Sequence, residues 1–373
     1  MDPKITAIDE IGDTMTFTLT NTNVSIANAI RRILLSEIPC VVFKTIPYED
    51  SKVNISINTS KFNNEVIKQR LSCIPIHISD LDFPINDYQL EIDKENDTDN
   101  VIYVTTEDFR IKNIKLDNYL KESTIQTIFP KNSITNQYID FIRLNPKFST
   151  NIKGEQLKLS CRFAIGTAKE QGMFNVVSTC CYKFTQDQGL INHVWTQREK
   201  ELKMTKTREE IEDMKKDMKK DWLTLDAKRL VIKNSFDFTI ETLGIYTNFK
   251  LVEMACDILM EKFNNFKTAL MSNPNLINET KSVNDNSYDI TLENEDYTIG
   301  KVIEFILHNK YFTELDILHY CGFLKQHPHN DYSIIRVIFK NIVDNREILT
   351  IFSDVVTIAN DIFKKIKDNF TID

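Results

Sequence analysis

The chain has little glycine, no excess of basic residues and none of the short motifs that mark common catalytic sites. Glycine accounts for only 8 of 373 residues, and none of these lies in a Gly-rich phosphate-binding sequence. HExxH and GxSxG motifs are also absent. The formal net charge is −8, which disfavours direct nucleic-acid binding, because such binding relies on Lys and Arg to neutralise phosphates. These absences favour a function that operates through protein contacts.

Cysteine usage and hydrophobic runs indicate the environment of the chain. The seven cysteines include no CxxC pair, and no signal peptide or run of about 20 apolar residues occurs. We therefore expect an intracellular protein without a membrane segment, whose thiols pack as small hydrophobic groups. A hydrophobic content of 42% and an aromatic content of 10% indicate a folded chain. Its length allows two or three domains.

The stretch from Asn21 to Phe43 predicts a helix followed by a strand. Polar residues that can cap a helix precede apolar residues at helical spacing, and Pro39 ends the pattern. Arg31 and Arg32 interrupt the apolar stripe, and at least one of them must leave it. Taken alone, this stretch fits an ordinary amphipathic core helix.

A second stretch repeats the first. Tyr297–Leu307 repeats the order of apolar, small and polar residues in Val24–Leu34, and Gly300 and Ala27 are the matching small residues. Each stretch follows an alternating, strand-like run, and each unit ends in a long amphipathic helix, at 248–270 and 345–368. The repeat predicts two related units that pair with each other. The residues expected at this pairing surface are Ile26, Ala27, Ile30, Ile33, Leu34, Ile299, Gly300, Ile303, Ile306 and Leu307.

Both stretches resemble parts of a known family. NVSIANAIRRILLSEIP is similar to the signature helix shared by the bacterial RNA polymerase alpha subunit, its archaeal D-type equivalent and the third-largest subunit of eukaryotic RNA polymerase II. YDITLENEDYTIGKVIEFIL and HYCGFLKQHPHND, within residues 284–373, resemble their smaller partner, which is the archaeal L-type protein or the eleventh eukaryotic subunit. The resemblance covers nearly the whole chain. It implies that both partners are fused, an arrangement known from large cytoplasmic DNA viruses.

The implied fold is α+β, with two alpha-type dimerisation units paired as an intramolecular pseudo-dimer. The phrase RLSCIPI resembles the family's RLGLIPL, near the start of an inserted β-rich domain. The resemblance and the strand pattern give a first dimerisation domain at 1–48 and 157–272, an insert at 49–156, a linker at 271–286 and a second dimerisation domain at 287–373.

The resemblance also implies a partner-binding site. GTAKEQGMF resembles the family loop GIAKEHAKW, with Gln171 in place of His and Phe174 in place of Trp. The implied contacts to the second-largest polymerase subunit are Arg31, Arg32, Glu37, Lys169 and Glu170. An ordinary surface β-loop is the alternative for this segment. The implied partners are the largest and second-largest RNA polymerase subunits and other small subunits, with no cofactor, small-molecule substrate or direct nucleic-acid contact.

Three functions remain open at this point. The resemblance implies a non-catalytic assembly platform of a viral DNA-directed RNA polymerase, located in the virion and host cytoplasm, or in the nucleus for a cellular protein. A metal- or thiol-dependent enzyme would use His327, His329 and Cys321, although their spacing matches no standard metal site. The insert has no cysteine between Cys73 and Cys161, so the four-cysteine zinc site that many cellular third-largest subunits carry there is not expected. A stand-alone interaction protein is the third possibility.

Residues 198–221 carry interleaved charges of both signs. Glu–Lys pairs at helical spacing predict an exposed helix or a mobile charged segment that extends from the domain.

Overall fold

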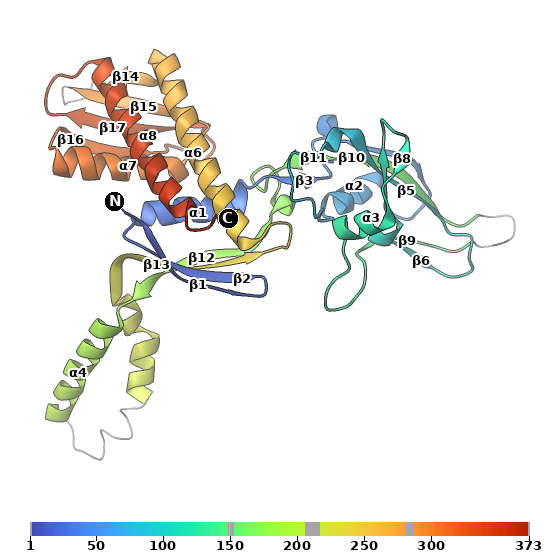
Figure 1. The fold of residues 1–373 in the computed structure, drawn as a ribbon, viewed down its shortest axis with the longest axis horizontal. Coiled ribbons are helices and arrows are strands. Elements are labelled where there is room, and N and C mark those ends of the chain that lie inside the picture. Colours follow the sequence, from blue (N-terminus) through green and yellow to red (C-terminus); the bar gives the residue numbers. More distant parts are fainter. Residues whose placement is uncertain (1, 148, 150–152, 206–216, 281–285, 372–373) are drawn as a thin grey trace. The chain divides into compact units, whose positions relative to one another are not determined.

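The computed structural model describes residues 2–147, 149, 153–205, 217–280 and 286–371, which form two compact units (Figure 1). Unit 1 comprises Met1–Leu34, Thr179–Glu241 and Asn248–Asp373. Unit 2 comprises Leu35–Ser178 and Thr242–Thr247. In the part of the chain that the structure describes, no helix combines the length and apolarity that a membrane crossing requires.

The first layer of unit 1 is an antiparallel four-stranded sheet in the order β1-β2-β13-β12. Its strands are β1 (Lys4–Ile11), β2 (Thr14–Thr20), β13 (Val231–Thr242) and β12 (Val177–Gln186). The turn between β1 and β2 lies at Gly12, whose positive φ of 60° suits glycine. Apolar and hydroxyl residues alternate along β2, so that Met15, Phe17 and Leu19 are buried while the threonines face the other side. Helix α1 (Val24–Ser36) follows directly.

The second layer of unit 1 repeats this arrangement. Its four-stranded sheet has the order β14-β15-β17-β16. The strands are β14 (Ile277–Glu279), β15 (Ser287–Glu293), β17 (Tyr332–Phe339) and β16 (Leu318–Leu324). Helix α7 (Tyr297–Ile306) continues into a π-helical stretch, η7 (Leu307–Glu314). Within the expected linker 271–286, the 3-10 turn η6 (Pro274–Leu276) passes into β14, and the apolar Leu276 and Ile277 are buried.

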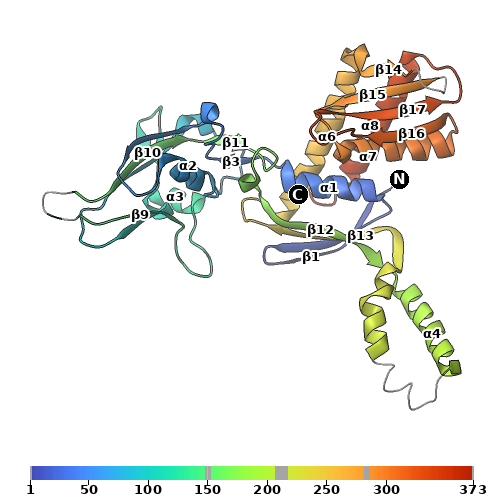
Figure 2. The same ribbon diagram turned by 180° about the vertical axis from the view of Figure 1, so that it is seen from behind.

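Two long helices join the layers. Helix α6 (Asn248–Ser272) packs along α8 (Asn345–Lys367), and Figure 2 shows them side by side with α1 near their ends. Phe263 and Phe363 stack with ring centroids 5.9 Å apart. Phe370, after α8, meets Phe17 of the first sheet at 5.0 Å. The two layers of unit 1 thus share one apolar core.

A helical hairpin extends from the first sheet after β12 (Figure 1). It contains α4 (Gln188–Thr205), residues 217–224 and the 3-10 turn η5 (Asp226–Arg229). Trp195 and Trp222 pack together at 5.3 Å and form a small core at its base. Most of the remaining side chains are exposed, as expected for the charged segment 198–221, of which residues 206–216 lie outside the described residues.

Unit 2 is β-rich around an aromatic core. Its main sheet has the five-strand order β4-β10-β5-β7-β8. These strands are β4 (Val53–Asn58), β10 (Gln156–Arg162), β5 (Tyr88–Glu95), β7 (Arg110–Asn113) and β8 (Asn118–Tyr119). Smaller pairs are β3 (Cys40–Val42) with β11 (Ala164–Gly166), and β6 (Ile102–Thr105) with β9 (Asp140–Leu144). The helices are α2 (Asn64–Ser72) and α3 (Glu122–Ile128). The core includes Phe43, Phe109, Phe129, Phe141 and Phe163.

Unit 2 is larger than the expected insert 49–156. Strand β10, which follows that segment, lies between β4 and β5 and pairs with both. Strand β3, which precedes it, pairs with β11. The flanking segments therefore belong to the same compact unit through strand pairing.

Candidate assembly interface

The helices α1 and α7 begin in the same way. Asn23 accepts a hydrogen bond from the backbone N–H of Ser25 at 2.9 Å, and Asp296 accepts one from that of Thr298 at 2.8 Å. The caps are thus the Asx residues Asn23 and Asp296. Asp296 and Thr298 also interact with α1.

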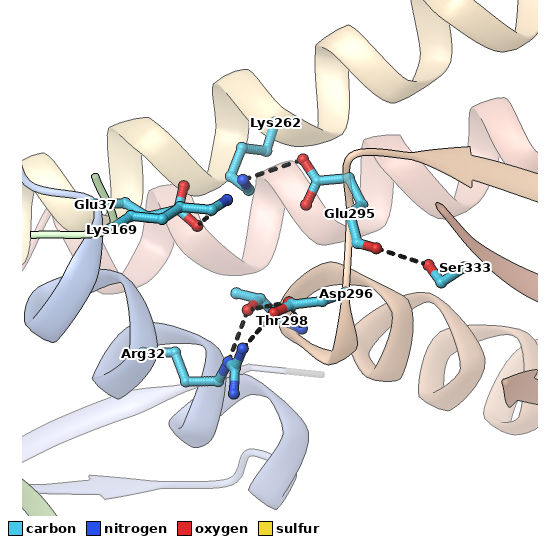
Figure 3. Close-up of polar contacts among 8 residues, drawn as sticks. All are labelled: Arg32, Glu37, Lys169, Lys262, Glu295, Asp296, Thr298 and Ser333. Atoms are coloured by element: carbon cyan, nitrogen blue, oxygen red, sulfur yellow. Dashed lines mark hydrogen bonds and ion pairs between the residues drawn. The ribbon is translucent and has the colours of Figure 1, made fainter. Parts of the chain in front are cut away.

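Arg32 of α1 contacts the start of α7 (Figure 3). Its Nη2 pairs with the carboxylate of Asp296, and its Nε donates to Thr298 Oγ1 at 2.8 Å. The side chains of Arg32 and Asp296 are 35% and 34% exposed. A planar guanidinium that binds a cap carboxylate and a neighbouring hydroxyl fixes both distance and orientation. This contact joins the first layer of unit 1 to the second.

Lys262 of α6 forms a less exposed ion pair with Glu295, directly before Asp296 (Figure 3). Lys262 Nζ lies 3.0 Å from Glu295 Oε1, and the two side chains are 14% and 17% exposed. The backbone oxygen of Glu295 accepts a hydrogen bond from Ser333 Oγ at 2.9 Å. The adjacent residues Glu295 and Asp296 thus bind two different helices, α6 and α1 respectively.

Polar contacts continue along α6 and α8. Asn360 donates to Asn264 at 2.8 Å, and Lys367 lies 2.7 Å from Asp257. The hydrogen bond to Asp257 raises the pKa of Lys367. Together with the stacked phenylalanines, these pairs fix the register of the two helices.

The residues expected at the pairing surface are buried in unit 1. Ile26, Ala27, Ile30, Ile33 and Leu34 in α1, and Ile299, Gly300, Ile303, Ile306 and Leu307 in α7 and η7, all lie in the interior. At Gly300, an added Cβ would overlap the ring of Phe323 in β16. Gly300 therefore allows α7 to lie close to β16.

Arg31 and Arg32 diverge. Arg31 Nε donates to Asn28 of the same helix at 2.9 Å. Burial raises the pKa of Cys180 in β12 to about 12, and the positive charge of Arg31 opposes this rise. Arg31 thus lies beside the first sheet, whereas Arg32 contacts α7.

Unit 2 brings together the other three candidate residues. The backbone N–H of Lys169 donates to the carbonyl of Ser36 at 2.7 Å, and its Nζ lies 3.3 Å from Glu37 (Figure 3). Glu170 pairs with Lys44 at 3.3 Å. Phe174 is buried. The loop is anchored at both ends, and Lys169 and Glu170 remain at its surface.

The family assignment follows from comparison with known proteins. The family model for the RNA polymerase Rpb3/Rpb11 dimerisation domain matches residues 16–263. The chain belongs to this family. Its fold is α+β, as expected from the sequence. The match includes α1, the loop at 167–174 and most of α6.

Individual relatives agree with this assignment. The DNA-directed RNA polymerase II subunit RPB3 of Schizosaccharomyces pombe is 40% identical over 68 residues, or 18% of this chain and 20% of that protein. The subunit 3 of RNA polymerases II, IV and V from Arabidopsis thaliana is 39% identical over 74 residues, 20% of this chain and 21% of that protein. These matches span about a fifth of each relative. The Methanosphaera stadtmanae subunit Rpo3 is 25% identical over 266 residues, 64% of this chain and 87% of that protein.

The His/Cys cluster of this Rpb3/Rpb11-type chain does not resemble a reactive site. The His329 N–H donates to His327 Nδ1 at 3.1 Å within a turn. Burial raises the pKa of Cys321 to about 11, which favours the protonated, unreactive thiol. Among the described residues, no three His, Cys, Asp or Glu side chains group as metal ligands.

Asp296, Glu295 and Lys262 were not singled out from the sequence. Asp296 precedes Thr298 by two residues, a spacing typical of an Asx cap, so its role at the helix start had a detectable signal. Lys262 and Glu295 had none, because a polar pair between distant segments leaves no periodic pattern.

Proposed function

We propose that this chain is a non-catalytic assembly subunit of a DNA-directed RNA polymerase, in which one polypeptide supplies both members of an Rpb3/Rpb11-type pair. Residues 287–373 stand in for the smaller partner, and the first dimerisation domain at 1–48 and 157–272 stands in for the larger. The observation that carries the proposal is the contact of Arg32, inside the family match, with Asp296 and Thr298, outside it.

The mechanism is scaffolding. The two halves form one platform through α1, α6, α7 and α8, and this platform holds the largest and second-largest subunits together. Fusion replaces a bimolecular encounter by an intramolecular one, with an effective concentration of order millimolar. It also fixes the ratio of the two halves at one to one. A viral source, with action in the virion and host cytoplasm, is part of the proposal; a cellular chain would act in the nucleus.

Partner contacts are assigned to Arg31, Glu37, Lys169 and Glu170. Arg31 lies beside β12, and the other three lie at the anchored loop. Arg32 contributes to the platform itself, since it contacts Asp296 and Thr298.

The test is reconstitution of the tagged full chain with the two large polymerase subunits of the same source. We expect both subunits to be recovered with the chain, and Lys169→Glu to reduce recovery of the second-largest subunit. Lys158→Glu is the matched control, because Lys158 is a similarly exposed lysine of unit 2 that pairs with Asp93 at 2.6 Å. Recovery of neither large subunit would contradict the proposal.

A further inference from the structure

The outer face of the second sheet in unit 1 carries an exposed apolar strip. Along β17, Ser333, Ile335, Val337 and Phe339 are buried, so the alternate residues Tyr332, Ile334, Arg336 and Ile338 face outward. Register places Tyr320, Gly322 and Leu324 of β16 opposite Ile338, Arg336 and Ile334. Tyr320, Leu324 and Tyr332 are 48%, 52% and 40% exposed. Two adjacent strands thus present aromatic and aliphatic side chains to the outside.

Two more exposed isoleucines lie past the ends of the strands. Ile317 is held next to Lys340 by a backbone hydrogen bond of 3.1 Å. Ile342, two residues further on, is 88% exposed. Apolar side chains that are exposed together on one face of a sheet are typical of protein interaction sites.

The equivalent face of the first sheet is different. Its β2 strand presents Thr14, Thr16, Thr18 and Thr20 on the side opposite the buried Met15, Phe17 and Leu19. Thr18 and Thr185 donate to Asp237 at 3.0 Å and 2.7 Å. This face of β2 is covered by hydroxyls, with the 75% exposed Ile11 of β1 opposite Thr14 at one end. The strip of aromatic and aliphatic side chains on β16 and β17 thus has no counterpart on β2.

The charges on and beside the strip indicate what it binds. Arg336 is already neutralised, because it forms two hydrogen bonds of 2.7 Å with Asp289. Glu293 faces Tyr332 across the β15–β17 ladder, and the exposed Asp331 precedes Tyr332. On the β15 and β17 side, this end of the strip is therefore bordered by carboxylates, while Lys325 follows Leu324 on the β16 side. A complementary partner is apolar along the strip and basic at this end.

The dimensions of the strip fit a helix. Two neighbouring strands and their side chains give a width of about 10 Å, which equals the diameter of an α-helix. From Tyr332 to Ile338 the strip extends about 20 Å, the length of a helix of about 13 residues. We propose that the outer face of β16 and β17 binds an amphipathic helix of a partner protein, with an apolar stripe over Tyr320, Leu324 and Ile334 and a Lys or Arg beside Glu293. None of the residues assigned to the second-largest subunit lies on this surface, and the inference rests on the proposed function only in treating the chain as an assembly subunit.

The test is site-specific photocrosslinking of the tagged full chain in the cells that express it. Benzoylphenylalanine at Leu324 is compared with the same group at Thr16, the exposed position on the first sheet. We expect crosslinking from position 324 to a single partner peptide, mapped by mass spectrometry, with apolar residues at helical spacing and a flanking Lys or Arg. Glu293→Lys should lower this yield about fivefold, as for the loss of a rim charge pair, and Glu241→Lys on the first sheet should not.

Several outcomes would overturn the inference. Equal crosslinking at positions 324 and 16, or no crosslinking at either, would show that the strip is not a binding site. Crosslinks to a second copy of this chain, or to a segment without the amphipathic pattern, would contradict the proposed partner. A yield unaffected by Glu293→Lys would contradict the charge pairing. A second site at Tyr332 guards against a local folding defect at Leu324. Co-purification of the large polymerase subunits is scored separately, so failure of the proposed function is distinguishable from failure of this inference.

Discussion

Arg32 and Asp296 form an ion pair although 264 residues separate them in the sequence. Asp296 also caps α7, so one carboxylate both starts a helix and binds α1. Asp296→Asn keeps the cap acceptor and removes the charge. Because the pair is about one-third exposed, we expect Arg32→Ala to lower the free energy of unfolding by about 1 kcal/mol.

A double-mutant cycle in urea, followed by circular dichroism, measures this coupling. We expect Arg32→Ala and Asp296→Asn together to cost less than the sum of the two single changes. Arg31→Ala is the matched control, since Arg31 bonds within its own helix, and it should be additive with Asp296→Asn. Strict additivity for Arg32 would contradict the assigned contact.

Gly300 should tolerate no side chain while Phe323 is in place. An added Cβ meets the ring of Phe323, so Gly300→Ala should lower the thermal midpoint, at a cost of about 1–3 kcal/mol. Gly300→Leu should be worse. Phe323→Leu in the Gly300→Ala background should restore part of the lost stability. Ala27 is the matching position in α1 and is also buried. A Gly300→Leu protein as stable as the parent would argue against the aligned repeat.

The two halves should remain together after the chain is cut. A protease site placed within residues 281–285 should give fragments that co-elute in gel filtration. Helix α6 packs against α8 and forms ion pairs with Lys367 of α8 and with Glu295. Glu295→Lys should weaken this association, and Lys262→Glu in the same chain should restore part of it. Two separately soluble monomeric fragments would disprove the intramolecular pairing.

Asp354 should make stability fall in acid. Burial alone would raise its pKa, but hydrogen bonds from Lys310 and Tyr311 outweigh burial and lower the pKa. A lowered carboxyl pKa contributes stability that is present above the unfolded-state value of about 3.9 and is lost as pH falls through the folded-state value. We expect Asp354→Asn to lower the thermal midpoint at neutral pH and to leave a smaller difference from the parent at the acid end.

Local elements could be predicted from the sequence because their signals are local. The alternation around Met15 and Phe17, the positive-φ turn at Gly12 and the stop at Pro39 are readable from neighbouring residues. The two long helices also lie close to their expected ranges, since their apolar stripes repeat over many turns. The π-helical continuation η7 was not predicted, because its hydrogen-bond shift leaves no simple spacing.

The partners of polar residues could not be predicted from the same patterns. Arg32 was expected to contact another subunit, and the choice of Asp296 depends on how α7 lies against α1. The position of β10 between β4 and β5 likewise depends on pairing among strands far apart in sequence. Periodicity identifies which face of a strand is buried, but it does not specify which strand lies beside it.

The separation between Arg32 and Asp296 also affects synthesis of the chain. Ribosomes add about 5–20 residues per second, so the 264 residues from 33 to 296 take roughly 13–50 s to make. During that interval α1 has emerged while its C-terminal counterpart does not yet exist. For separately encoded partners, this delay would depend on cellular concentration and diffusion. Here it depends on the length of unit 2 and the helical hairpin, so extending either segment would lengthen the period in which α1 has no α7 to bind.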